Sequence, residues 1–202
     1  MSTDIRSSSG QAVITRACGF RLFAGAAFML WLLLAVVATA GGKTHPDAAI
    51  SDAQGKLHVP SDYRKDYQYL GTWSVAADKG RGAAQMHVVY ASPGAVEAWR
   101  KLGHFPNGTV LVKEVFEAGT QPMTTGTVSR TKTLQGWFVM IRDSRNTHPQ
   151  SPLWGDGWGW AWFDADKPQT TTTRDHAECL GCHEPARATD LIYTEGYPVL
   201  GK

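Results

Sequence analysis

The stretch Gly157-Trp158-Gly159-Trp160-Ala161-Trp162-Phe163 decides the fold, because it alternates large and small side chains with a period of two. Successive side chains of a β-strand point to opposite faces of a sheet, so this period predicts a strand with one bulky face and one nearly bare face. We expect the tryptophans in the core; a ligand-stacking platform is the alternative. The bare face of Gly159 and Ala161 would let a flat ligand approach the sheet.

Four further runs upstream are rich in aromatic and β-branched residues and predict strands at 67–76, 85–91, 109–117 and 134–142. One helix is predicted after the second strand, with Ser92 as N-cap, Pro93 at its first position and Gly103 at its end. No helical periodicity is long enough for a four-helix bundle. The expected fold class is α+β, a predominantly antiparallel β-sheet with a few short helices.

A second stretch, Cys179-Leu180-Gly181-Cys182-His183, has the C-x-x-C-H pattern by which c-type haem is attached. Positions i, i+3 and i+4 share one face of a helix, so both cysteines can form thioethers to one porphyrin while His183 offers a neutral nitrogen to the iron. A zinc site would need four ligands, yet the only other cysteine is Cys18. A thioredoxin-like pair needs neither the histidine nor a secretory leader. The sequence predicts haem c on a C-terminal helix, with His183 as metal ligand.

The first 40 residues have the pattern of a signal peptide. A polar, arginine-containing segment precedes an apolar run at 22–37, and A-T-A at 38–40 suits cleavage. The apolar run is long, so an uncleaved membrane anchor is the alternative. In either case residues 41–202 are expected in the periplasm, associated with the membrane only if the leader is retained.

The remainder is long enough for one domain with a core of its own. We expect an exposed lead-in segment at 41–62, rich in Gly, Asp and Pro, and a haem domain at 63–202. The leader holds three of the 20 basic residues and one of the 18 acidic residues, which leaves 17 of each. A neutral surface gives no reason to expect nucleic acid as a partner.

The tail after His183 offers no second protein ligand for the iron, because its 19 residues contain no Met, His or Cys. Electron-transfer cytochromes usually saturate the iron with a second protein ligand such as Met. Such a ligand would have to come from one of six upstream residues: Met86, Met123, Met140, His87, His104 or His148. We predict instead an open sixth position at which a small molecule binds.

Several short segments spread over residues 55–200 form a recognisable pattern. They are Leu70-Gly71-Thr72-Trp73, the run F-P-N-G-T-V-L-V-K-E at 105–114, Arg142-Asp143-Ser144, Thr189-Asp190 and the tail Y-P-V-L at 197–200. They closely resemble the cytochrome P-460 family and its relative cytochrome c′-beta. The resemblance implies a mainly β fold, commonly a homodimer, with one five-coordinate haem c. Cytochrome P-460 proteins oxidise hydroxylamine through a haem cross-linked to a lysine, whereas c′-beta relatives lack that bond, have an apolar distal pocket and bind nitric oxide.

The resemblance places the family's cross-linking lysine at Lys113. Strand parity puts Lys113 on one face with Leu111 and Val115, which favours a side chain that points inward. Burial of an unpaired ammonium is unfavourable and would shift the amine towards its neutral, nucleophilic form. The alternative is an edge lysine that reaches solvent.

Two positions depart from the family's pattern. The family's distal arginine is matched by His87, and its distal glutamate by Phe138. A glutamate there could take protons from hydroxylamine, whereas Phe138 cannot. His87 could replace it, because an imidazole titrates near neutral pH. Met140 shares the strand face of Phe138, and the two would form an apolar cap suited to nitric oxide.

Two functions follow for an exported mono-haem c cytochrome. One is an oxidoreductase that acts on hydroxylamine or nitric oxide at an open iron and passes electrons to a periplasmic acceptor. The other is a nitric oxide-binding or electron-transfer cytochrome with no turnover of its own. Lys113 favours the first function and Phe138 the second, so the sequence leaves open whether the protein is an enzyme.

Overall fold

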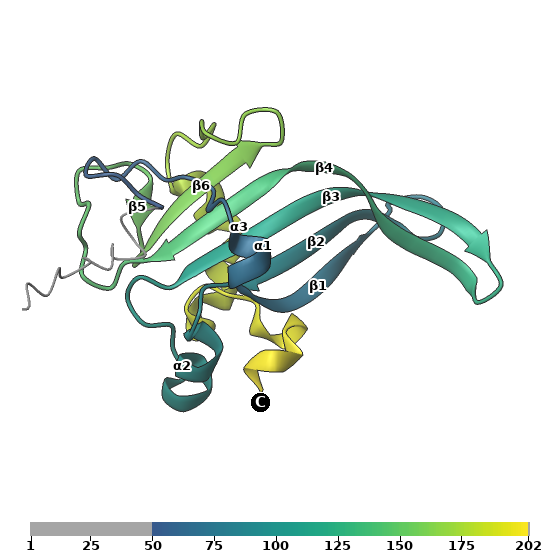
Figure 1. Ribbon diagram of the computed structural model, residues 1–202, viewed down its shortest axis with the longest axis horizontal. Coiled ribbons are helices and arrows are strands. Elements are labelled where there is room, and N and C mark those ends of the chain that lie inside the picture. The colour runs from purple at the N-terminus through teal and green to yellow at the C-terminus, as the bar shows by residue number, and fades with distance from the viewer. Residues whose placement is uncertain (1–49, 202) are drawn as a thin grey trace, which may run out of the picture. The chain divides into compact units, whose positions relative to one another are not determined.

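One antiparallel sheet of six strands organises residues 50–201, the part of the chain described by a computed structural model (Figure 1). The strand order is β1-β2-β3-β4-β6-β5. The strands are β1 (Gln68–Ala76), β2 (Ala83–Ala91), β3 (Val110–Met123), β4 (Gly126–Arg142), β5 (Trp154–Gly155) and β6 (Trp158–Asp164). This confirms the predicted fold class and the five strands expected from the sequence, to which the structure adds the short β5.

The helices are short and lie outside the sheet. They are α1 (Tyr63–Asp66), α2 (Ala95–Leu102), α3 (Ala177–His183) and three 3₁₀ turns, η2 (Glu184–Thr189), η3 (Thr194–Gly196) and η4 (Pro198–Leu200). The prediction that α2 begins at Ser92 is wrong. The Ser92 hydroxyl accepts a hydrogen bond from the Val110 amide at 3.0 Å, and Gly94 precedes the helix instead.

The leader predicted at residues 1–40 lies outside the described residues. All described residues belong to one compact unit, Gly42–Lys202. Within residues 50–201 none of the helices is both long and apolar enough to cross a membrane.

Both faces of the sheet are covered. Period-two alternation along β3 sends Leu111 into a core with the C-terminal residues Leu191 and Leu200, and sends Val112 into a second core with Leu57. Figure 1 accordingly shows α1 in front of the middle of the sheet and α3 behind it. The sheet therefore lies between the segment that precedes β1 and the segment that follows β6.

The two faces of the alternating stretch in β6 pack into the two cores on opposite sides of the sheet. Trp158 and Trp160 are each 1% exposed in the core on the α3 side, which confirms their prediction as core residues. Other parts of the chain cover the bare face. A Cβ atom on Gly159 would lie 2.9 Å from Trp154, and Ala161 packs in the opposite core. The prediction of a flat ligand on this face is therefore wrong, because another part of the chain fills it.

The lead-in segment expected to be exposed is partly buried. Of its described residues, Ile50 is 3% and Leu57 0% exposed. Asp52 turns the chain between them, because its side chain accepts hydrogen bonds from the amides of residues 54 and 56 at 3.0 and 2.8 Å. A turn of polar residues thus carries two apolar side chains to the sheet, where Trp154 donates to the Gly55 carbonyl at 2.6 Å.

β3 and β4 are both longer than predicted. Their pairing continues to Met123 and Gly126, and Figure 1 shows this hairpin projecting beyond β1 and β2. Register shifts on both sides of Phe116 separate the projecting part from the central sheet. The sequence did not reveal the extension because its side chains meet solvent, so they lack the apolar alternation that marks a half-buried strand.

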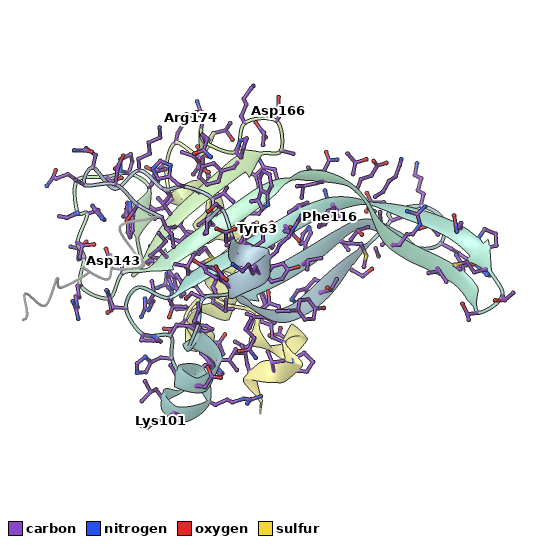
Figure 2. The ribbon with its side chains drawn as sticks, viewed as in Figure 1. Tyr63, Lys101, Phe116, Asp143, Asp166 and Arg174 are labelled. Atoms are coloured by element: carbon purple, nitrogen blue, oxygen red, sulfur yellow. The ribbon has the colours of Figure 1, made fainter. Side chains whose placement is uncertain are left out.

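A buried carboxylate ties α1 to the central strand. Glu114 is 2% exposed and accepts hydrogen bonds from the Tyr63 hydroxyl and from Arg64 Nε, the latter at 2.6 Å. The Tyr63 hydroxyl also accepts from Trp137 at 2.8 Å, and Figure 2 shows Tyr63 over the sheet. These contacts satisfy Glu114 and hold the strand on which Lys113 faces the other side.

The C-terminal segment approaches β1 very closely at one point. A Cβ atom on Gly71 would lie 2.5 Å from the Gly196 carbonyl oxygen. We expect Gly71→Ala to lower the free energy of unfolding by about 1–3 kcal/mol, because backbone has to move. Urea unfolding measures the change. Gly119→Ala is the control, since its new methyl would first meet Lys132 at 3.7 Å. Equal effects of the two substitutions would contradict the close approach.

Candidate functional site

A cavity of about 340 Å³ lies between the sheet and the C-terminal segment. Its lining is mainly apolar and includes Leu111, Met140 and Trp160. All six residues that the sequence predicted for the site also line it: His87, Lys113, Phe138, Cys179, Cys182 and His183. The fold thus brings together residues that lie almost 100 positions apart.

The motif forms a helix, as predicted. Asp175 accepts a hydrogen bond from the Ala177 amide at 2.9 Å at the start of α3, and the helix ends at His183. The two cysteines of the helix form no disulfide, and burial raises the pKa of the Cys179 thiol. The helical spacing directs both sulfur atoms and the imidazole to the same cavity.

His183 is oriented by the chain that follows it. Its Nδ1 lies 2.7 Å from the Leu191 carbonyl oxygen, which can only accept, so Nδ1 carries the hydrogen and Nε2 has a free lone pair. Burial lowers the pKa of His183, which favours the neutral ring. The ring meets Trp160 edge-on at 5.0 Å. Metal-ligating histidines have this arrangement, in which the second nitrogen donates to a fixed acceptor.

The donor set therefore fits haem, with two thiols one helical turn apart and an imidazole with Nε2 free. It does not fit zinc. Within residues 50–201 no three His, Cys, Asp or Glu side chains gather as a metal site.

Lys113 and Phe138 face each other across β3 and β4. They are paired residues in the register, and Lys113 Nζ lies 4.3 Å from the centroid of the Phe138 ring. Phe138 in turn packs on Trp162 at 4.5 Å. β3 lies inside the sheet, so the alternative of an edge lysine is wrong. Burial lowers the pKa of the Lys113 ammonium, which favours the neutral, nucleophilic amine.

His87 enters the cavity from β2. Its Nε2 lies 3.1 Å from the Gln85 side-chain oxygen. Burial, and then the charge of Lys113, lower the pKa of His87 to about 4. The prediction that it titrates near neutral pH is therefore wrong, because the apolar surroundings disfavour the imidazolium. At neutral pH His87 is an uncharged and weak proton acceptor.

The structure narrows the choice of a second iron ligand. Of the six upstream candidates only His87 and Met140 line the cavity. Met123 is 53% exposed at the end of the hairpin, and His148 stacks on Trp154 at 4.4 Å. The open sixth position stays a prediction, with two side chains rather than six as its alternatives.

Sequence reasoning missed an aromatic wall contributed by the tail. Tyr193 donates a hydrogen bond to the Cys182 carbonyl at 2.8 Å, and Trp73 meets Tyr193 and Tyr197 edge-on at 6.4 and 6.3 Å. Burial raises the pKa of Tyr197 to about 12. The sequence signals were the presence of aromatic residues in a tail without periodicity and the place of Trp73 and Tyr197 in segments that resemble the family.

An apolar cavity over an antiparallel sheet, with a C-x-x-C-H helix at its wall, is typical of a haem-binding β protein. Comparison with protein-family models matches residues 60–194 to Cytochrome P460. This match spans more than half of the chain, so the chain belongs to the cytochrome P460 family and is a haem-binding cytochrome. No curated protein matches the chain.

The low pKa of His87 predicts a pH-dependent stability. Below the ordinary value of 6.5 the unfolded chain binds a proton at this ring, while the native protein does not until about pH 4. The free energy of unfolding should therefore fall as the pH is lowered from 6.5 to 4, with about 1–2 kcal/mol of the fall due to His87, because solvent screens its half-buried ring. Urea unfolding of the native protein and His87→Gln at pH 7 and pH 5 measures this. Parallel curves for the two proteins would show that His87 titrates normally.

Proposed function

We propose that this chain is an exported mono-haem c cytochrome whose open distal position binds an uncharged small nitrogen species, nitric oxide first. The observation that carries the proposal is the lack of a carboxylate: among the described residues that line the cavity none is Asp or Glu. An apolar cavity disfavours charged ligands, and a cavity without a carboxylate lacks the usual general base for chemistry that releases protons.

Five residues that line the cavity have roles in this proposal. Cys179 and Cys182 hold the porphyrin by thioethers, and His183 Nε2 is the iron ligand. Haem bound here supplies an iron centre that takes a small ligand and changes its redox state. Phe138 and Met140 keep water and charge away from the distal side, which suits a diatomic molecule that needs no solvation.

Oxidation of hydroxylamine is the second candidate, and Lys113 favours it. The side chain lies in the cavity, and its lowered pKa supports the nucleophilic form that a cross-link to the porphyrin requires. Hydroxylamine must lose protons as well as electrons. The cavity offers only His87 and Lys113 as acceptors, and a cross-link would consume Lys113.

The proposal also covers where the protein is located in the cell and which proteins it binds. The leader pattern supports export to the periplasm, with a periplasmic protein as electron acceptor, and the family resemblance supports a homodimer.

Covalent attachment is tested by removing both sulfur atoms. Cys179→Ala combined with Cys182→Ala should yield exported protein that shows no haem stain on a denaturing gel. In the proposed function the thioethers are the only covalent bonds to haem, and haem without a covalent bond is lost on denaturation. Staining that persists in the double variant would place the attachment elsewhere.

The state of Lys113 separates the two candidate functions. If the protein oxidises hydroxylamine as family members with a cross-link do, peptide mass mapping should find the Lys113 peptide joined to the haem peptide of residues 179–183. The ferrous Soret band should then also lie far to the red. A free Lys113 peptide in fully haem-loaded protein would favour the nitric oxide-binding function.

The missing proton acceptor is tested at Phe138. We expect Phe138→Glu to raise hydroxylamine turnover by about 100-fold, because a carboxylate in the cavity can act as a general base. Lys113 lies opposite, so the new carboxylate should pair with it, and adding Lys113→Met should raise the pH at which turnover appears. Phe138→Gln is the matched control, which has similar size and no basic oxygen.

Nitric oxide binding should stay unchanged or weaken in Phe138→Glu. Rapid turnover by the native protein, with no effect of Phe138→Glu, would contradict the proposal and require a base outside these positions.

A further inference from the structure

The Leu191 carbonyl, which accepts the hydrogen bond from His183, belongs to a turn with an uncommon backbone conformation. Asp190 and Leu191 both have left-handed backbone conformations, with φ of 58° and 64°. Neither is glycine, and each such residue is unfavourable by about 1–2 kcal/mol. Two in succession persist only where surrounding contacts hold them. The turn directs the Leu191 carbonyl at His183 Nδ1, at 2.7 Å.

Asp190 supplies most of the contacts that hold this turn. One carboxylate oxygen accepts from the Phe105 amide at 2.9 Å, and the other accepts from Arg142 Nη2 at 3.3 Å. The Asp190 carbonyl accepts from Trp158 Nε1 at 3.0 Å. The turn is thus fastened to three separate parts of the fold: the loop after α2, the end of β4 and the start of β6.

Arg142 is itself fixed in place. Its Nη1 donates to the Gly157 carbonyl at 2.7 Å, and its guanidinium lies 5.3 Å from the centroid of a Trp158 ring. The side chains of Arg142 and Asp190 are only 17% and 18% exposed, so their ion pair is partly shielded from solvent. A side chain at Gly157 would collide with the guanidinium. The end of the sheet is therefore shaped around this arginine.

We propose that Asp190, held by Arg142, is a positioning residue that sets the hydrogen bond between the Leu191 carbonyl and His183, and through it the electron donation of His183 to iron. The inference rests on the proposed role of His183 as iron ligand. A strong bond at Nδ1 makes the imidazole a more basic ligand, which stabilises the ferric state and lowers the reduction potential. Leu191 is 3% exposed, so water does not compete for its carbonyl.

Asp190→Gly in the haem-loaded protein is the decisive variant. Glycine adopts the left-handed conformation freely, so this change removes the carboxylate contacts without adding backbone strain. We expect the iron–histidine stretching band of the ferrous protein to move to lower frequency and the reduction potential to become more positive. Asp190→Asn keeps an acceptor for the Phe105 amide and loses the charge that faces Arg142, so its shifts should be smaller.

Asp156→Gly is the matched control. Asp156 also has a left-handed backbone, with φ of 53°, and its carboxylate pairs with Arg187 at 3.0 Å and His176 at 3.6 Å rather than with Arg142. Both readouts should be unchanged in this variant. Equal shifts in Asp156→Gly and Asp190→Gly would overturn the inference, and so would a folded Asp190→Gly protein with native band and potential.

A second variant keeps the inference testable if Asp190→Gly does not fold. Arg142→Gln removes the ion pair and the guanidinium contacts with Gly157 and Trp158, but leaves the Asp190 carboxylate with the Phe105 amide. It should move both readouts in the same direction by less, whereas native values would overturn the inference. The native protein separates this inference from the proposed function. A ferrous protein without an iron–histidine band would refute a five-coordinate iron held by His183, and with it the open distal position of the proposed function. A native band that Asp190→Gly leaves in place would refute only the role of Asp190.

Discussion

A sheet with apolar side chains on both faces must be covered on both faces, and the rest of this structure depends on that constraint. Alternation along β3 places Val112 on one face and Leu111 and Lys113 on the other. The segment before β1 covers the first face, and the segment after β6 covers the second. Because the second cover also carries α3, the packing that buries this face also builds the cavity wall with its two thiols and imidazole.

The two sides of the cavity differ in how their polar groups are satisfied. His183 Nδ1 donates to a buried carbonyl, and the Tyr193 hydroxyl donates to the backbone of the motif helix, so hydrogen bonds orient the side that would hold the porphyrin. On the other side Lys113 meets the face of Phe138. Burial lowers the pKa of both Lys113 and His87, so this side favours neutral groups and neutral ligands.

Much of this arrangement could be predicted from local patterns. A period of two located the strands, because apolar and polar side chains alternate along a strand that has one buried and one exposed face. The same parity predicted that Lys113 points inward, and the spacing of Cys179, Cys182 and His183 predicted one helical face. The prediction of a ligand on the bare face of Gly159 was wrong, because periodicity shows that the faces differ and not what covers each. The prediction that His87 titrates near neutral pH was wrong for a similar reason, because the burial of its ring depends on residues far away in the sequence.

The sequence by itself therefore determined the strands, the motif helix and the residue types available to the site, all of which depend on spacings of a few residues. Only the tertiary structure decided which parts of the chain meet. It placed Lys113 against Phe138, Trp154 over Gly159 and the turn at Asp190 beneath His183. The close approach of Gly71 to Gly196 is of the same kind. Contacts of this sort follow from the packing of segments far apart in the chain, and no local pattern of side chains encodes them.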